Sequence, residues 1–267
     1  MVAGQGGATV VSLSARGLTL AYGSRVVASG LDLEVPEGAF TAIVGPNACG
    51  KSTLLRALVR LLAPAEGSVV LDGRDLAGWR TRAVAHTLGF LPQGLSAPDS
   101  ITAGQLVARG RYPHQSLLSS WSAGDEAVVA ETMELAGVAE LADRPVRELS
   151  GGQRQRVWVA MVLAQQTRYL LLDEPTTFLD ITHQFQLLRL LRRLREQGRT
   201  VVAVLHDLNQ ACRFADHLVA MRDGQVVAEG APADVVDAEL VGAVFDLDCV
   251  VVPDPVAGTP MIVPAAG

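Results

Sequence analysis

The amino-acid sequence predicts an α/β fold with a mainly parallel core sheet, an N-terminal antiparallel β subdomain and a helical subdomain. Two segments of alternating polarity flank a short turn near the N-terminus, which is typical of antiparallel strands. Apolar strands later alternate with helical segments, and this alternation implies right-handed crossovers within a parallel sheet. Strand signals vanish between residues 96 and 149, which indicates a helical insert. We expect a single domain over residues 9–267, behind a flexible glycine-rich tail over residues 1–8.

The composition is that of a globular, mildly acidic protein. The 267 residues include 22 Lys+Arg and 28 Asp+Glu, for a net charge of −6, and 49% are hydrophobic. A negative balance disfavours nucleic-acid binding, which needs clustered basic residues, so no nucleic-acid partner is expected. No uncharged apolar run approaches the ~18 residues of a membrane span, and a basic signal-peptide region is missing, so we expect a cytosolic chain.

The first elements follow from polarity and turn residues. Residues 10–20 and 26–35 alternate apolar and polar residues around Tyr22-Gly23-Ser24, and a turn follows at residues 35–38. Residues 40–44 read as a short buried strand. A helix is predicted over residues 53–62, where leucines recur at helical spacing before Pro64.

The later elements follow the same logic. The helical subdomain is expected at about residues 96–160, with helical periodicity over residues 123–142. Strands are predicted at residues 169–172 and 200–205 with a helix between them, and a hairpin at residues 217–222 and 226–229. Residues from about 231 to 267 form a C-terminal extension.

A glycine-rich loop lies between the predicted strand at residues 40–44 and the helix that follows. It fits the pattern G-x-x-x-x-G-K-[ST] in the required strand-loop-helix context. Its backbone N–H groups and the helix N-terminus can cradle phosphates, Lys51 can neutralise them, and the Ser52 hydroxyl can ligate Mg²⁺. Lys51 is also the only lysine in the chain. The candidate phosphate-binding residues are Gly45, Pro46, Asn47, Ala48, Cys49, Gly50, Lys51, Ser52 and Thr53.

A second element, Leu170-Leu171-Leu172-Asp173-Glu174, brings two carboxylates to the end of an apolar strand. Ligands of open α/β sheets bind at such carboxyl ends. Asp173 can hold Mg²⁺, and Glu174 can orient or deprotonate an attacking water. A solvated acidic turn before Pro175 is the alternative for this element taken alone.

A third element, Leu149-Ser150-Gly151-Gly152-Gln153, opens a helix, and with it the chain resembles the ATP-binding cassette (ABC) ATPases. LSGGQ is the signature of that family. The resemblance implies a P-loop NTPase core of the RecA-like type, with MgATP as the ligand and hydrolysis of ATP as the reaction. An ordinary capped helix start with no role in nucleotide chemistry is the alternative for these residues.

Four further motifs stand where the family has them. Tyr22 resembles the aromatic residue that stacks on adenine, and Gln93 the Q-loop glutamine, which implies a role at the metal. Phe178-Leu179-Asp180 resembles the D-loop, so Asp180 is expected near the nucleotide. His206, after the strand at residues 200–205, resembles the switch histidine and joins Glu174 and Lys51 as a candidate catalytic residue.

The likeness is greatest to the ATPases of bacterial iron-siderophore importers. It rests on residues 107–115, 173–180 and 254–260, and haem and cobalamin importer ATPases share parts of it. The resemblance implies a head-to-tail dimer of two copies, a separate permease and, indirectly, an extracytoplasmic substrate-binding protein. The chain would then work at the cytoplasmic face of the membrane. The cargo itself is not encoded in this subunit.

Three other functions fit the sequence less well. A soluble cassette protein of chromosome maintenance would need a long coiled coil between the nucleotide motifs, and the interval from Lys51 to Ser150 leaves no room for one. A translation-factor cassette would carry two copies of the motifs in one chain. A kinase or small GTPase would leave residues 149–153 unexplained.

Two departures from the family pattern stand out. Ala48 occupies a position where glycine is common, so the loop is strained if that residue needs a positive φ. Thr177-Phe178 replaces the usual Ser-Ala of the D-loop.

The three cysteines are too far apart in sequence for a disulfide framework or a zinc site. Cys49 lies at a helix N-terminus beside an ammonium group, which favours a reactive thiolate facing the phosphates; a small filler pointing away is the alternative. Cys212 and Cys249 are expected to be packing residues.

The resemblance places the permease-docking face in the helical subdomain, after Gln93. It comprises Arg109, Arg111, Tyr112 and His114, which mix basic and aromatic side chains as interface anchors do. A solvated basic face is the alternative.

Overall fold

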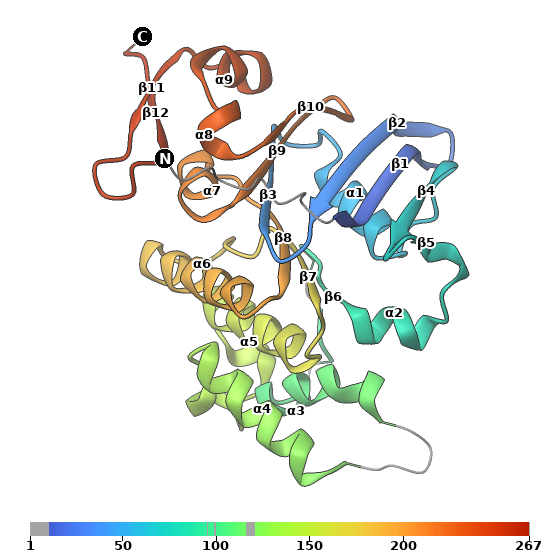
Figure 1. Ribbon diagram of the computed structural model, residues 1–267. Coiled ribbons are helices and arrows are strands. Elements are labelled where there is room, and N and C mark those ends of the chain that lie inside the picture. Colours follow the sequence, from blue (N-terminus) through green and yellow to red (C-terminus); the bar gives the residue numbers. More distant parts are fainter. Residues whose placement is uncertain (1–10, 95, 99, 116–120, 267) are drawn as a thin grey trace, which may run out of the picture.

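The computed structural model describes residues 11–94, 96–98, 100–115 and 121–266. The predicted tail over residues 1–8 lies outside the described residues. Two sheets and a helical region make up most of the fold (Figure 1). The predicted fold class is confirmed: a mainly parallel core sheet, an antiparallel N-terminal sheet and a bundle of helices.

The N-terminal sheet is antiparallel, with strand order β2-β1-β4-β5. Tyr22 and Arg25 pair at the tip of the hairpin formed by its two long strands. Alternate residues of these strands are buried, so one face of the sheet packs on the core and the other faces solvent. Its strands are β1 (Val11–Tyr22), β2 (Arg25–Pro36), β4 (Glu66–Leu71) and β5 (Arg74–Asp75).

The core sheet has the order β10-β9-β3-β8-β7-β6. All neighbours are parallel except β9 and β10, which form an antiparallel hairpin at one edge. The predicted late hairpin is therefore an extension of the core sheet. Its strands are β3 (Phe40–Val44), β6 (Leu88–Leu91), β7 (Tyr169–Asp173), β8 (Thr200–Val204), β9 (His217–Arg222) and β10 (Gln225–Gly230).

Side chains of the core strands alternate between two hydrophobic layers. On one face, Leu170 and Leu172 pack against helices α5 (Gly151–Ala164), α6 (Ile181–Glu196) and α7 (Leu208–Phe214). On the other, Leu171 packs with α1 (Lys51–Leu58) and the N-terminal sheet. Both faces are thus covered, which explains why the core strands read as continuous apolar runs.

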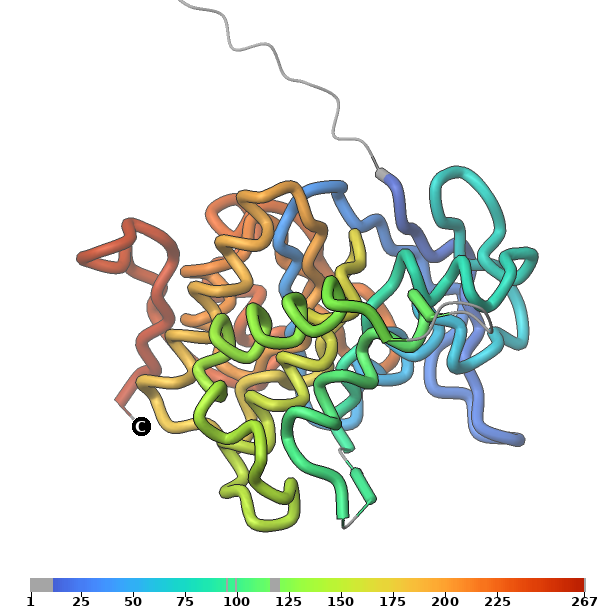
Figure 2. The backbone as a smooth tube through the Cα atoms, turned by 90° about the horizontal axis from the view of Figure 1, so that it is seen from below, coloured from blue at the N-terminus to red at the C-terminus, as the bar shows by residue number. Residues whose placement is uncertain are grey.

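The helical region has a core of its own, built by α3 (Ala103–Ala108), α4 (Ala123–Leu135) and α5. Seen from below, these helices lie side by side under the sheet (Figure 2). Helix α2 (Thr81–Thr87) connects the N-terminal sheet to β6. Short 3-10 helices are η1 (Leu76–Gly78), η2 (Arg109–His114), η3 (Ala139–Leu141) and η4 (Val146–Glu148).

The C-terminal extension adds two short helices and a hairpin that stands apart at one edge (Figures 1 and 2). The Asn209 side chain in α7 donates from its Nδ2 to the Ile262 carbonyl and accepts the Ile262 N–H at its Oδ1, and so ties the hairpin to the core. The elements are α8 (Pro232–Val235), α9 (Ala238–Phe245), β11 (Cys249–Pro253) and β12 (Pro260–Pro264).

Two predicted helices end earlier than expected. The helix predicted to reach residue 62 stops at Leu58, because Arg60 adopts a left-handed φ of 60° and its guanidinium bonds the carbonyls of Leu76 and Trp79. The pattern over residues 123–142 is α4 followed by a turn and the 3-10 helix η3, since Gly137 has a positive φ of 62°.

Candidate functional site

The chemistry-bearing residues meet at the carboxyl edge of the core sheet. Asp173 pairs in register with Val204 on the adjacent strand, so Glu174 and His206 leave neighbouring strand ends. Gln93 follows β6, which pairs with β7 on its other side. Gln93, Glu174 and His206 border one cavity of about 630 Å³. Its lining is Tyr22, Arg25, Val27, Asn47, Ala48, Gly50, Lys51, Ser52, Thr53, Gln93, Glu174 and His206.

The glycine-rich loop wraps the Lys51 side chain at the start of α1. Its ammonium donates to the carbonyl oxygens of Gly45 and Pro46 at 2.9 and 2.7 Å, and the residue is only 5% exposed. A side chain at Gly45 would clash with the Met221 carbonyl oxygen, so glycine is required there. The cation is thus held within the loop, beside the free N–H groups of the helix start.

Ala48 has a φ of 63°, so this loop position does adopt the left-handed conformation that favours glycine. We expect Ala48→Gly to raise the free energy of unfolding by about 0.5–1 kcal/mol, because the strain of the Cβ exceeds the entropy that glycine loses on folding. Urea titration measures the change. Ala231→Gly, at an exposed residue with a φ of −64°, is the matched control and should lower stability. Equal effects of the two substitutions would contradict the strain argument.

Cys49 does not line the cavity, so the expectation that its thiol faces the phosphates is wrong and the alternative of a small filler holds. Cys49 is 5% exposed and belongs to the core cluster under the N-terminal sheet. Its sulfur lies 3.9 Å from the Lys51 ammonium, and the residue is not among those that line the cavity. Cys212 is buried, which raises the pKa of its thiol to about 12, and Cys249 packs partly against the core.

Asp173 ends β7 and is fully buried. Its Oδ1 accepts a hydrogen bond from the Ser52 hydroxyl at 2.9 Å, whereas its Oδ2 is buried without a hydrogen-bond partner among the described residues. Burial is the main cause that raises the pKa of this carboxyl. A buried carboxylate oxygen with no donor, next to a hydroxyl, is a fitting environment for a hard cation such as Mg²⁺.

Glu174 is held in place by the next strand. Its Oε2 lies 2.8 Å from the Nε2 of His206 and accepts a bond from the Thr177 hydroxyl at 3.3 Å. The backbone of Glu174 has a φ of 54°, a strained conformation that turns its side chain at the end of the strand. A carboxylate fixed in this way beside the phosphate loop can take a proton from a water in the cavity.

Arg25 and Val27 line the cavity and were not predicted. They begin β2, on the other side of the turn from Tyr22, whose hydroxyl accepts a bond from Arg56 at 3.3 Å. Hairpin pairing with Tyr22 is the signal that could have indicated them. Tyr22 itself is 45% exposed, so its ring is free to stack on a planar group.

The signature residues lie elsewhere on the chain. Ser150 caps α5 and forms a capping box with Gln153, and Gly151 and Gly152 pack against the D-loop at Phe178. Asp180 caps α6 by accepting from the His183 backbone. None of these residues borders the cavity.

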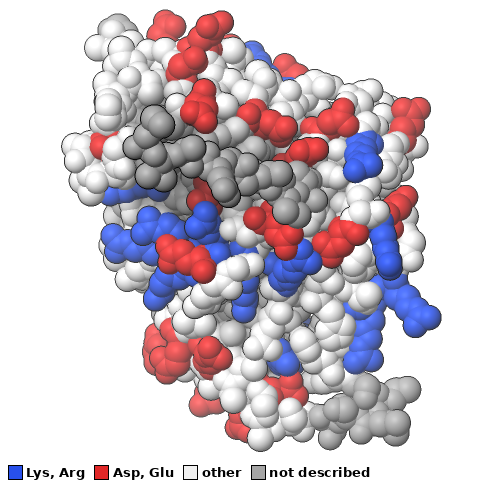
Figure 3. Space-filling view, viewed as in Figure 1, with Lys and Arg blue, Asp and Glu red and all other residues white. Residues whose placement is uncertain are grey.

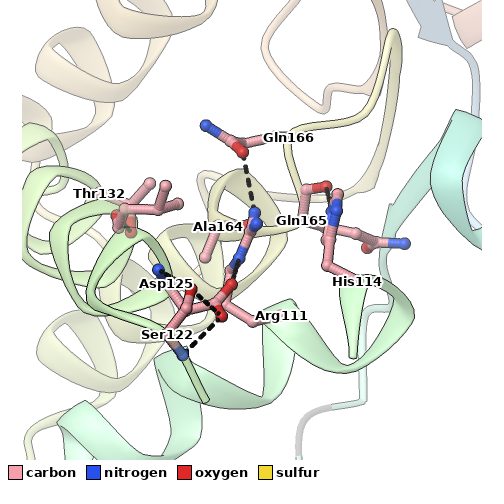
Figure 4. A network of polar contacts seen from close by, with 9 residues as sticks. Arg111, His114, Ser122, Asp125, Thr132, Ala164, Gln165 and Gln166 are labelled. Carbon is pink, nitrogen blue, oxygen red and sulfur yellow. Dashed lines mark hydrogen bonds and ion pairs between the residues drawn. The ribbon is translucent and has the colours of Figure 1, made fainter. Parts of the chain in front are cut away.

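Arg111 is buried, so its predicted place on an exposed docking face is wrong. It is 7% exposed and bonds Asp125 at 2.9 Å, the Ala164 carbonyl at 2.7 Å and Gln166 at 2.9 Å (Figure 4). In the same network His114 bonds the Gln165 carbonyl at 2.9 Å. Arg111 therefore fixes η2 against α4 and α5.

Removal of Arg111 should destabilise the helical region. The Ser122 hydroxyl and then the Arg111 guanidinium lower the pKa of Asp125 to about 2, against 3.8 for a free carboxyl. The ion pair is therefore complete above pH 3.8 and is lost as the pH falls toward 2. We expect Arg111→Ala to lower Tm by about 5 °C or more at pH 7.

Thermal melts measured by circular dichroism at pH 7 and at decreasing pH check this. The difference in Tm between the two proteins should shrink in the acid range. The exposed Arg109→Ala is the control and should leave Tm nearly unchanged. A difference that does not depend on pH would contradict the role of the ion pair.

The family model described as "ABC transporter" matches residues 28–177. The chain is 55% identical to the ferric enterobactin transport ATP-binding protein FepC of Escherichia coli, across 96% of this chain and 95% of that protein. It is 51% identical to the achromobactin transport ATP-binding protein CbrD of Dickeya dadantii, across 96% and 95%.

Solved structures agree with this. The fold matches a metal-chelate type ABC transporter in an inward-facing conformation, with a TM-score of 0.81 and 27% identity over 96% of this chain and 98% of that one. It also matches a cassette dimer bound to ADP and Pi in a post-hydrolysis state, with a TM-score of 0.75 and 30% identity over 82% and 98%. Among the described residues, no helix is both long and apolar enough to cross a membrane. The chain belongs to the ABC transporter family, as an ATP-binding and ATP-hydrolysing cassette.

Proposed function

We propose that the chain is the ATP-hydrolysing motor of a ferric-siderophore importer and works as a head-to-tail pair of copies. The proposal of a pair rests on the separation of the phosphate-binding motif from the signature motif within one chain. The cavity holds Lys51, Ser52, Glu174 and His206, whereas Ser150 lies outside it. A second copy would bring its Ser150, Gly151 and Gly152 over the phosphates, and the dimeric cassettes among the similar structures support this arrangement.

We assign the residues of each composite site as follows. Tyr22 stacks on the base, the loop from Gly45 to Thr53 binds the phosphates, and Asp180 and Gln153 lie near the shared interface. Mg²⁺ would be held by Ser52 and Asp173 with Gln93, and when bound it neutralises phosphate charge. Glu174 accepts the proton of the attacking water, and His206 orients Glu174 through their 2.8 Å contact.

The cargo assignment rests on the relatives. FepC and CbrD carry the names of siderophore transport proteins, and an iron(3+)-hydroxamate import protein of Bacillus subtilis is 43% identical over 94% of this chain. Haem is the second candidate, because the hemin import protein HmuV of Rhodococcus jostii is 42% identical over 95% of the chain. The permease and an extracytoplasmic binding protein would select the chelate, and the cassette would lie at the cytoplasmic membrane face.

Transport in proteoliposomes tests the cargo. The chain is reconstituted with its permease and binding protein, and MgATP is placed on the cassette side. Accumulation of radioactive iron from ferric catecholate or hydroxamate siderophores is the expected result, with no uptake of labelled haem or cobalamin. Uptake of haem or cobalamin instead would replace the siderophore assignment by that alternative. Glu174→Gln, which cannot hydrolyse ATP in this scheme, gives the background.

We propose that the permease docks at Arg109 and Tyr112. His114 holds η2 in place through its bond to the Gln165 carbonyl. The side chains of Arg109 and Tyr112 are exposed, the latter to 61%, although Arg111 between them is not. We expect Arg109→Ala with Tyr112→Ala to reduce uptake at least about tenfold while the basal ATPase rate stays the same, because interface anchors carry most of the binding energy.

Uptake and co-purification with the permease measure this effect. The control replaces Arg16 of β1 and Val227 of β10, an exposed arginine and an exposed apolar residue of the two sheets, by alanine. Survival of both assembly and uptake in the Arg109/Tyr112 variant would place the docking face elsewhere.

A further inference from the structure

A second cavity, of about 510 Å³, lies between helices α4, α5 and α6. Its walls are the last turn of α4, Arg156 and Val159 of α5, and one side of α6 between His183 and Glu196. None of its lining residues borders the nucleotide cavity. A volume of this size matches the sites that hold small organic ligands.

The lining is rich in positive charge although the chain as a whole is acidic. It contains four arginines and two glutamates, whereas the chain has a net charge of −6. Figure 3 shows basic side chains gathered in a band over α6, between acidic areas above and below. Such a concentration of positive charge attracts anions.

Three of these four guanidinium groups have N–H donors without a protein acceptor among the described residues. Among the described residues, Arg189 and Arg193 form no hydrogen bond or ion pair, and they stand four positions apart on α6, where like charges repel. Arg156 donates one amino group to the Gly137 carbonyl, but its buried Nε has no partner in the part of the chain that the structure describes. Of the four arginines, Arg192 alone forms an ion pair within the described ranges, with Glu196 at 3.9 Å.

The floor of the cavity is apolar. Leu187 and Leu190 of α6 are 5% and 4% exposed, and Val159 of α5 is 1% exposed. Leu135, at the end of α4, is 41% exposed and borders the same space. An apolar floor below a rim of unpaired guanidinium groups complements a molecule with an apolar body and one acidic group.

We propose that this cavity is a binding site for a small amphipathic organic anion, separate from the nucleotide site. Arg189 and Arg193 hold its acid group, and its apolar body lies on Leu187 and Leu190. The acid group neutralises the repulsion along α6 and gives the free donors a partner. His183, in the wall of the cavity, bonds the Asp180 carboxylate at 2.8 Å, so its ring is engaged there and the arginines hold the acid group.

The test titrates the full chain with 1-anilinonaphthalene-8-sulfonate, an aromatic sulfonate that fluoresces when it leaves water. We expect saturable binding at one site, and displacement by decanoate but not by octyl glucoside or inorganic phosphate. Arg189→Gln with Arg193→Gln should weaken binding at least about tenfold, because two charge-assisted hydrogen bonds are lost. The matched control, Arg16→Gln with Arg74→Gln, replaces two exposed arginines of the N-terminal sheet and should change affinity less than about twofold.

Equal affinity in the two double variants would overturn the site. So would displacement of the dye by MgATP, or loss of dye binding in Lys51→Ala, because either result places the dye in the nucleotide cavity. Dye binding requires neither hydrolysis nor a permease, so its outcome is independent of the proposed transport function.

Discussion

Glu174→Gln should leave MgATP binding within a few-fold of the unchanged protein and slow ATP turnover by about 10²–10⁴-fold. Glutamine keeps the size of the side chain and can still accept a bond from Thr177, so the cavity is preserved. An amide cannot accept the proton of the attacking water, so hydrolysis stops before ADP forms. ATP then remains between two copies, and size-exclusion chromatography with MgATP should show a dimer.

The control is Glu140→Gln, an exposed carboxylate of η3 far from the cavity, which should hydrolyse ATP normally. Binding is measured with a fluorescent ATP analogue and turnover by phosphate release. A Glu174→Gln protein that hydrolyses at the normal rate, or that binds ATP as a monomer, would contradict the assigned role of Glu174.

Mixing two inactive variants should restore hydrolysis if each site is shared between copies. Lys51→Ala removes the phosphate cation, and Ser150→Arg places a bulky cation at the start of α5, so each variant alone should lose nearly all activity. In a mixed dimer one site has both defects, whereas the other has an intact phosphate loop and an intact signature. An equimolar mixture should therefore recover about a quarter of the unchanged activity, since half of the dimers are mixed and each has one good site.

The control mixes Lys51→Ala with Glu174→Gln. Lys51 and Glu174 line the same cavity of a single chain. Each chain of the mixed dimer therefore has one defect in its own cavity, and no activity should return. No recovery in the Lys51/Ser150 mixture would show that a site is completed within one chain. Recovery in this control would show that Lys51 and Glu174 of one chain do not serve the same site.

Much of the fold was predictable because its signals are local. The loop from Gly45 to Ser52 carries its own motif, and the strands around it are short apolar runs. Strand β6 was not predicted, since its four residues follow α2 without a break and leave no turn signal. The hairpin of β11 and β12 was also missed, because nothing in the local sequence shows that it docks on Asn209.

The parts of the candidate site that depend on strand register could be predicted from the sequence. The burial of individual side chains could not. Glu174 and His206 meet because Asp173 pairs with Val204. The burial of Arg111 depends on Asp125 and on the Ala164 carbonyl, 14 and 53 residues away, and spacing in the sequence gives no sign of either. The direction of the Cys49 thiol is likewise set by contacts that form only in the folded core.

The enclosed position of Lys51 makes the protein suited to footprinting with acylating reagents. No other side chain of the sequence carries a primary amine, and this one is 5% exposed and bonded to two carbonyls of its own loop. Any reagent adduct on a side-chain amine therefore reports that the loop has opened. The rate of that single acylation is a direct kinetic probe of loop opening, free of background from surface lysines.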